Sequence, residues 1–219
     1  MPRIPVYFMP GLAASSKIFE YVKLDDSLFE THYLEWLEPL SKKESISEYV
    51  TRLAQNIKHE NAVLIGVSFG GVIVQELSKL VNAKQVIIIS SIQNPQELPT
   101  RLQVIRNTKA YKLTPTKLLS SFDTLEKVVF GNWAKKRLEL YKKYLVMNSQ
   151  NYLKWAIHNV LHWQKSADLM KPIHIHGEND EIFPINRLKP DYIIKEGTHI
   201  MIINKAKWFN EMLPEIIIK

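Results

Sequence analysis

Short apolar runs alternate along the chain with longer stretches whose apolar positions recur at helical spacing. Six of the short runs are rich in aliphatic and β-branched residues, and they predict strands at residues 5–9, 33–36, 62–67, 85–90, 173–176 and 192–194. Several of these runs are apolar almost throughout, which favours strands that are buried on both faces of a parallel sheet.

Helical patterns lie between the predicted strands. Ser45 and Glu48 have the spacing of a capping box, and the apolar positions that follow them predict a helix that begins at this point. A second helix is predicted over residues 69–81 and a closing helix over residues 202–213. This order of strand, helix and strand predicts an α/β fold, a doubly wound and mostly parallel sheet of about six strands with helices on both faces.

The alternation breaks between residues 93 and 168. No run there predicts a strand, whereas residues 135–147 and 151–164 predict helices rich in Lys, Leu, Tyr and Trp. We therefore expect an α/β core formed by residues 1–92 and 169–219. Residues 93–168 are expected to form a helical cap subdomain that covers one edge of the sheet.

The strongest chemical signal is the motif Gly66-Val67-Ser68-Phe69-Gly70, which has the form Gly-x-Ser-x-Gly. It follows a predicted buried strand and opens a predicted helix, the context in which a sharp turn holds a serine hydroxyl out from the backbone. Glycines on both sides let neighbouring backbone approach closely. The amides at the start of the helix point towards a developing oxyanion. The motif therefore predicts that Ser68 is a nucleophile.

A serine hydroxyl needs a base to remove its proton and a further residue to orient that base. His199 lies in a loop between the last predicted strand and the closing helix, from which it can reach Ser68. The loop after the predicted strand 173–176 contains three acidic residues. Asp180 is favoured as the orienting acid, and Glu178 and Glu181 stay open as alternatives.

The order of Ser68, Asp180 and His199, together with the serine motif in its context, resembles the α/β-hydrolase superfamily. The resemblance covers most of the chain outside residues 93–168, and a helical cap at that place is typical of the family. It implies an oxyanion hole formed by the main-chain amides of Leu12 and Phe69. The chain departs from the family after the first strand, where Met-Pro-Gly-Leu stands in place of the usual His-Gly.

The composition of the chain excludes several kinds of catalytic and metal site. The chain of 219 residues has no Cys, which excludes a cysteine nucleophile, disulfides and thiolate metal sites. Its formal net charge of +7 is uneven, because residues 93–168 contain 13 Lys or Arg and 5 Asp or Glu, a net charge of +8, and the remainder carries −1.

The basic residues of this segment include a group interleaved with tyrosines, namely Lys135, Lys136, Arg137, Lys142 and Lys143. Such a group can be read as a nucleic-acid surface. Because these basic residues recur at helical spacing, we favour a solvated helix face. The alternative is a surface that attracts an anionic substrate. We expect no nucleic-acid partner.

Two histidines suggest a metal site at first sight. His174 and His176 lie on one face of a predicted strand, and Glu178 and Asp180 follow, which superficially resembles the His-x-His-x-Asp-His cluster of metallo-hydrolases. The adjacent Asp-His pair of that cluster is absent. We therefore expect no metal site and no cofactor.

The chain has no apolar run near the roughly 18 residues that a membrane helix needs, and its first residues do not resemble a signal peptide. We expect a cytoplasmic protein without stable membrane insertion, and the oligomeric state stays open. Most aromatic residues of the cap are expected to pack between its helices. Trp155 and Trp163 are our candidates for lining an apolar acyl or aryl pocket between the cap and the sheet.

Together these features predict a cofactor-independent serine hydrolase that cleaves a small-molecule ester or thioester through an acyl-enzyme on Ser68. Two alternatives stay open. One is a binding protein or receptor that keeps the fold without turnover. The other is an enzyme that hydrolyses a C–C bond or acts as a lyase with the same residue types.

Overall fold

The computed structural model describes residues 2–109, 143–167 and 169–219 of the chain. At its centre lies a six-stranded sheet in which every strand is parallel to its neighbours, in the order β2-β1-β3-β4-β5-β6. The strands are β1 (Ile4–Met9), β2 (Phe29–Tyr33), β3 (Ala62–Val67), β4 (Ala83–Ile89), β5 (Ile173–Gly177) and β6 (Tyr192–Ile194). The predicted α/β fold with a parallel sheet of about six strands is confirmed.

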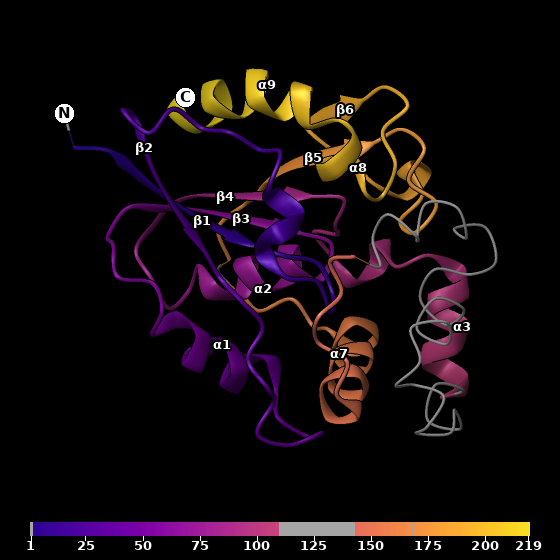
Figure 1. Cartoon of the computed structure of the whole chain (residues 1–219). Coiled ribbons are helices and arrows are strands. Elements are labelled where there is room, and N and C mark those ends of the chain that lie inside the picture. Colours follow the sequence, from indigo (N-terminus) through magenta and orange to yellow (C-terminus); the bar gives the residue numbers. More distant parts are fainter. Residues whose placement is uncertain (1, 110–142, 168) are drawn as a thin grey trace.

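Helices cover both faces of the sheet (Figure 1). One face packs against α1 (Ile46–Ala54), α2 (Phe69–Leu77) and α7 (Gln150–His162). The other packs against α8 (Met201–Asn204), α9 (Ala206–Ile218) and the 3-10 helix η1 (Ser16–Phe19). Alternate side chains of a strand enter the two layers, so that Tyr7 and Met9 pack on the α1 side and Val6 and Phe8 on the α9 side. Two apolar clusters therefore hold the strand ends, and the loops that follow them, in place.

Five predicted strands differ from the observed ones by at most two residues at either end, but the strand predicted at residues 33–36 is wrong. The observed β2 is an edge strand that pairs only with β1, and its central Glu30, Thr31 and His32 are half-buried. A strand with one neighbour need not be apolar on both faces. The apolar run that follows is buried as a loop, in which Trp36 Nε1 donates to the Gly11 carbonyl at 2.9 Å.

The helix boundaries follow local chemistry. The capping box predicted for α1 is present, because Ser45 N donates to Glu48 Oε2 at 2.8 Å and Glu48 N donates to Ser45 Oγ at 3.2 Å. The helix predicted over 69–81 ends at Leu77. The predicted closing helix is two helices, α8 and α9, which are separated at Lys205.

The segment predicted as a cap is described in part. It contains the 3-10 helix η2 (Pro95–Glu97), α3 (Thr100–Thr108) and α7. Of the helix predicted over residues 135–147, residues 135–142 lie outside the described part of the chain. Residues 143–147 are not helical, because Leu145 pairs with Ala14 in an antiparallel bridge.

Helix α7 does not stand apart from the sheet. Its buried side chains, among them Tyr152 and Leu161, belong to the same apolar cluster as those of α1 and α2. The division of the chain into core and cap at residues 93 and 168 stays a prediction. Among the described helices, none is both long and apolar enough to cross a membrane.

Candidate functional site

Ser68 lies in a sharp turn between β3 and α2. Its φ of 53° and ψ of −120° are unfavourable for any residue with a side chain and cost on the order of 1–3 kcal/mol. Neighbouring groups hold this conformation, since Ser68 N donates to the Ile89 carbonyl at 2.9 Å and Ser91 Oγ donates to the Ser68 carbonyl at 2.7 Å. The strain and its supports fix the serine side chain at the carboxyl end of β3.

Two glycines of the motif permit this turn by their lack of a side chain. A Cβ atom at Gly66 would lie 2.3 Å from the Gly70 carbonyl oxygen, and one at Gly70 would lie 2.4 Å from the Pro10 carbonyl oxygen. Both distances are well below van der Waals contact. Gly70 therefore lets the loop after β1 pack directly against the start of α2, next to Ser68.

The structure brings the three predicted side chains Ser68, His199 and Asp180 into one hydrogen-bonded row. His199 Nε2 lies 2.9 Å from Ser68 Oγ, and His199 Nδ1 lies 2.9 Å from Asp180 Oδ2 and 3.1 Å from Asp180 Oδ1. They come from the loops after β3, β5 and β6, whose carboxyl ends share one edge of the parallel sheet. Because an ionised carboxylate only accepts, Nδ1 carries the proton, and Nε2 is left to accept from the serine hydroxyl.

The structure selects Asp180 among the three acidic residues of its loop. Asp180 is 3% exposed, and its Oδ1 accepts hydrogen bonds from the amides of Ile182 at 2.8 Å and Phe183 at 2.9 Å. Glu178 and Glu181 are exposed, and Glu178 accepts instead from the Glu196 amide at 3.0 Å.

Charge and hydrogen bonding keep the buried carboxylate ionised. Burial of Asp180 opposes its ionisation, but the charge of His199 beside it, the hydrogen bond from His199 and the amide of Phe183 outweigh burial and hold the pKa of Asp180 below its usual value. The carboxylate is therefore available to orient His199 throughout the neutral pH range.

Behind Asp180 lies a chain of hydrogen bonds that the sequence analysis missed. His176 Nε2 lies 2.8 Å from the Phe183 carbonyl oxygen, which can only accept, so this nitrogen carries the proton; it also lies 3.3 Å from Asp180 Oδ2. His176 Nδ1 then accepts from His174 Nε2 at 3.1 Å, and His174 Nδ1 accepts from Gln93 Nε2 at 3.2 Å. The two histidines that resemble metal ligands in sequence are thus engaged in hydrogen bonds.

Burial keeps these two histidines neutral. It lowers the pKa of His174 to about 3, with a further contribution from the neighbouring His176. Burial also lowers the pKa of His176, although the charge of Asp180 acts in the opposite direction. At neutral pH the pair therefore acts as an uncharged donor chain that ends at the Phe183 carbonyl and Asp180.

An apolar pocket opens over Ser68 and His199. Its described lining is otherwise aliphatic or aromatic and comes from the loops after β1 and β4, from α2, α3 and α7, and from the loop that carries Asp180. These residues are Leu12, Phe69, Val72, Ile92, Leu102, Ile105, Ile157, Val160, Leu161, Ile182 and Phe183. No charged side chain occurs in this described lining, so the pocket favours an apolar group next to the serine.

The two residues expected to supply oxyanion donors both line this pocket beside Ser68. Phe69 is the first residue of α2, where helix amides lack an intrahelical acceptor. Leu12 lies in the loop after β1. This loop is fixed on both sides of Leu12, by the bond from Trp36 Nε1 to the Gly11 carbonyl and by the bond from the Ala13 amide to Tyr152 Oη at 3.0 Å.

The two tryptophans expected in the pocket lie elsewhere. Trp155 is 0% exposed and its Nε1 donates to the Glu44 carbonyl at 2.8 Å; Trp163 is 2% exposed and its Nε1 donates to Glu76 Oε1 at 2.8 Å. Neither lines the pocket, because the face of α7 that meets it carries Ile157 and its neighbours instead. Both tryptophans anchor residues 155–163 to the core.

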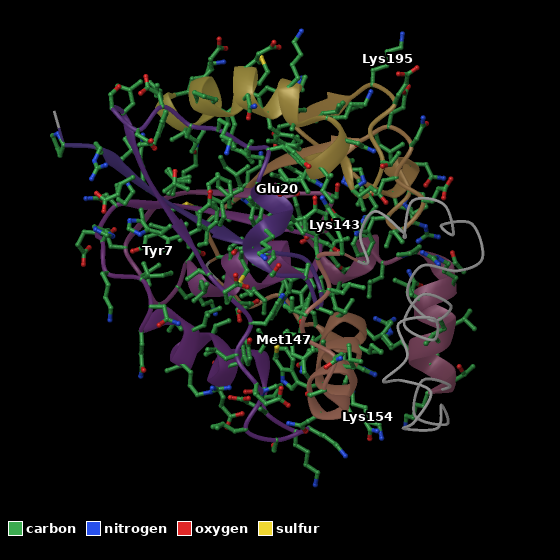
Figure 2. All side chains as sticks on the ribbon, viewed as in Figure 1. Tyr7, Glu20, Lys143, Met147, Lys154 and Lys195 are labelled. Carbon is green, nitrogen blue, oxygen red and sulfur yellow. The ribbon has the colours of Figure 1, made fainter. Side chains whose placement is uncertain are left out.

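Most of the basic group falls outside the described residues, namely Lys135, Lys136, Arg137 and Lys142. The described Lys143 forms an ion pair with Glu20, with Nζ and Oε1 2.9 Å apart, and both residues are labelled in Figure 2. Tyr144 Oη donates to the same carboxylate. Lys143 thus compensates a carboxylate near η1 and does not line the pocket.

Comparisons with known proteins identify the fold. No family model matches the chain, and no curated protein matches its sequence. A thermophilic esterase from Thermogutta terrifontis aligns with a TM-score of 0.68 at 12% identity, over 98% of this chain and 89% of its own. A bromoperoxidase from Bacillus anthracis aligns with a TM-score of 0.68 at 16% identity, over 99% and 92%. An epoxide hydrolase from Bacillus megaterium aligns with a TM-score of 0.68 at 14% identity, over 100% and 94%. The chain therefore has the α/β-hydrolase fold.

Proposed function

We propose that this protein is a serine hydrolase that cleaves a carboxylic ester or thioester through an acyl-enzyme on Ser68. The observation that carries the proposal is the row from Ser68 Oγ to His199 Nε2, at 2.9 Å, and from His199 Nδ1 to Asp180 Oδ2, at 2.9 Å. The row ends in an apolar pocket at the serine. Solved esterases share this fold, so the scaffold is one on which ester hydrolysis occurs.

The first half of the reaction forms the acyl-enzyme. His199 Nε2 takes the proton of Ser68 as Oγ attacks the substrate carbonyl carbon, and the carbonyl oxygen becomes an oxyanion. The amides of Leu12 and Phe69 donate to that oxyanion. The imidazolium of His199, stabilised by Asp180, then gives its proton to the leaving alcohol or thiol as the bond to the acyl carbon breaks.

The second half releases the acid. A water molecule takes the place of the leaving group, and His199 removes its proton as the water oxygen attacks the acyl carbon. The new tetrahedral intermediate collapses, the Ser68 ester bond breaks, and the proton returns from His199 to Ser68 Oγ. The enzyme ends each cycle in its starting state and needs no cofactor.

The pocket lining supports a small-molecule substrate with an apolar acyl or alcohol group. Eleven of the thirteen described lining residues are aliphatic or aromatic, and the other two are Ser68 and His199. An anionic group on the substrate would lie outside this described lining. Its attraction to the basic surplus of residues 93–168 stays a prediction, to be tested by the salt dependence of turnover.

Activity-based labelling tests the proposal directly. We expect a fluorophosphonate probe to label the wild-type chain on Ser68, and an activated aryl ester to give a burst of alcohol equal to the enzyme concentration. Ser68→Ala should abolish both. Ser78→Ala is the matched control, because Ser78 Oγ bonds the Gln75 carbonyl at 2.6 Å at the far end of α2.

The outcome that contradicts the proposal is a folded chain that the probe does not label. Ligand-dependent thermal stabilisation with an unreactive serine would instead favour a binding protein on this fold. A panel of short and long acyl esters and acyl thioesters then separates ester from thioester hydrolysis.

A further inference from the structure

Three metal-ligating side chains converge at the edge of the sheet that carries β2. Glu30 and His32 lie two residues apart on β2, and His59 lies in the loop between α1 and β3. One ligand atom from each lies within 4.8 Å of the other two. Glu30 Oε1 lies 3.2 Å from His32 Nε2 and 3.5 Å from His59 Nε2. All three side chains are about one-third exposed, at 34%, 29% and 37% respectively.

Two of the three side chains are oriented by further polar groups. Tyr7 Oη lies 2.7 Å from His59 Nδ1, which leaves Nε2 to face Glu30. Arg3 Nη2 donates to Glu30 Oε2 at 3.1 Å, which leaves Oε1 to face the histidines. Metal-bound histidines and carboxylates commonly have such partners on their second polar atom, because the partner fixes the direction of the first.

The third side chain, His32, is held by its ring faces. Its imidazole stacks on the Tyr7 ring, with centroids 4.6 Å apart and planes 18° apart, and its centroid lies 4.7 Å from that of His59. His32 Nε2 is buried and has no hydrogen-bond partner in the described structure, although it faces the Glu30 carboxylate. A cation at this point would satisfy the nitrogen and the carboxylate oxygen together.

We propose that Glu30, His32 and His59 bind a divalent transition-metal ion of the zinc type. Zinc takes His nitrogen and carboxylate oxygen at about 2.0–2.2 Å in a tetrahedron, which puts neighbouring ligand atoms about 3.3–3.6 Å apart. The two separations that involve Glu30, 3.2 and 3.5 Å, already match this geometry. The ligand atoms of the two histidines lie within 4.8 Å of each other, and an approach of the two imidazoles completes the set. A water molecule takes the fourth position, which the partial exposure of the Glu30 and His59 side chains allows.

The ion has a structural role in this proposal, which does not rest on the proposed function. His59 precedes the amino end of β3, whereas Ser68 follows its carboxyl end, and a strand of six residues is about 20 Å long. Tyr7, labelled in Figure 2, lies on the side of the sheet that carries α1. The ion would tie β2, which has only one neighbouring strand, to the loop between α1 and β3.

Metal titration of the full-length chain tests this site. After treatment with a chelator, Zn²⁺ is titrated in by calorimetry, and Co²⁺ is added separately to record the visible absorption of a tetrahedral nitrogen and oxygen site. We expect one ion per chain and a Tm that rises with Zn²⁺ concentration. His59→Ala and Glu30→Gln should each lose the calorimetric binding of Zn²⁺ and the visible absorption of Co²⁺.

The control removes one member of another histidine pair. His158 and His162 lie one turn apart on α7, with ring centroids 4.6 Å apart, and offer a different place for an ion. His158→Ala should therefore leave the titration unchanged. Unchanged binding in His59→Ala, or loss of binding in His158→Ala, would overturn the proposal.

A milder variant keeps the test decisive if His59→Ala does not fold. Tyr7→Phe retains the ring that stacks on His32 and removes only the hydroxyl that contacts His59 Nδ1. Removal of such a partner weakens metal binding by about 10- to 100-fold. A folded Tyr7→Phe protein with wild-type affinity for Zn²⁺ would contradict the site, as would a wild-type chain that binds no ion.

Discussion

Two pairs of potential metal ligands occur on strands of this sheet, the members of each pair two positions apart, and the two pairs form different structures. His174 and His176 on β5 are 0% exposed, and their nitrogens join a chain of hydrogen bonds that reaches Asp180. Glu30 and His32 on β2 are about one-third exposed, and their polar atoms converge on one point. Position in the sheet makes the difference, because β5 is an inner strand and β2 is an edge strand.

Burial decides what each group can do. In the interior, desolvation keeps both imidazoles neutral and their nitrogens are engaged in hydrogen bonds, so the pair can only orient its neighbours. At the edge, the three side chains are about one-third exposed, and His32 Nε2, although buried, has no hydrogen-bond partner in the described structure, so this group can still take an ion.

The largest effect is expected from Asp180→Asn. The amides of Ile182 and Phe183 donate to Oδ1, so the Asn oxygen takes that place and its NH₂ group faces His199. His199 Nδ1 must then accept, and the proton moves to Nε2, which can no longer accept from Ser68. We expect kcat for an activated ester to fall by about 10⁴-fold, the loss seen for the same change in a serine protease.

Glu181→Gln is the matched control for that change, because Glu181 is an exposed acid in the same loop. It should leave kcat within a factor of two or so, as expected for a surface substitution. Equal losses in the two variants would show that loop stability, and not the tautomer of His199, sets the rate.

The buried histidines predict a decline of stability in mild acid. Their folded pKa values lie below the unfolded value of 6.5, and that of His174 is about 3, so the unfolded chain binds more protons between these limits. The contribution of these two histidines to the free energy of unfolding is therefore complete above pH 6.5 and is lost as the pH falls towards 3. From pH 6.5 to 4.5, His174 alone should cost on the order of 2 kcal/mol of unfolding free energy.

Urea unfolding at several pH values measures this decline. His174→Gln should flatten the dependence on pH between 6.5 and 4.5, whereas Asp180, whose folded pKa lies below 3.8, contributes only at lower pH. A variant as sensitive to acid as the wild type would contradict the assignment of His174 as a neutral buried donor.

A smaller effect on turnover is expected from His176→Phe. The substitution keeps an aromatic ring and removes the N–H that lies 3.3 Å from Asp180 Oδ2 and bonds the Phe183 carbonyl. His176 is a positioning residue, so kcat should fall by about 10- to 100-fold, as small misplacements do, with KM unchanged. His176→Gln, which offers an amide N–H in a similar place, should recover part of the loss. Equal kcat values for the Phe and Gln variants would show that the N–H is not what matters.

The sequence predicted the elements that depend on local pattern. The inner strands are apolar because both of their faces are buried. Ser68, Asp180 and His199 follow the predicted strands that correspond to β3, β5 and β6, whose carboxyl ends share one edge of the parallel sheet. The edge strand β2 escaped detection, since Glu30 and His32 give it no apolar pattern.

Contacts between distant segments could not be read from sequence. His174 accepts from Gln93, which is 81 positions away. The sequence therefore showed only a spacing with His176 that superficially resembles a metal cluster, and it did not predict the hydrogen-bonded chain. Trp155 is apolar enough for a pocket or a core, and the rotation of α7 about its axis decides between them. That rotation depends on partners such as the Glu44 carbonyl, 111 positions away.

The smallest effect is expected at the exposed edge, from Arg3→Gln. Arg3 and Glu30 are 49% and 34% exposed, and an ion pair between exposed side chains contributes about 0–1 kcal/mol, less at high salt. We expect the free energy of unfolding of the metal-free protein, measured in urea, to change by less than about 1 kcal/mol. The same variant should bind Zn²⁺ more weakly than the wild type, because Glu30 Oε2 no longer accepts a hydrogen bond from Arg3. A large loss of stability without metal would mean that the edge is already rigid, and the contrast with the interior would then fail.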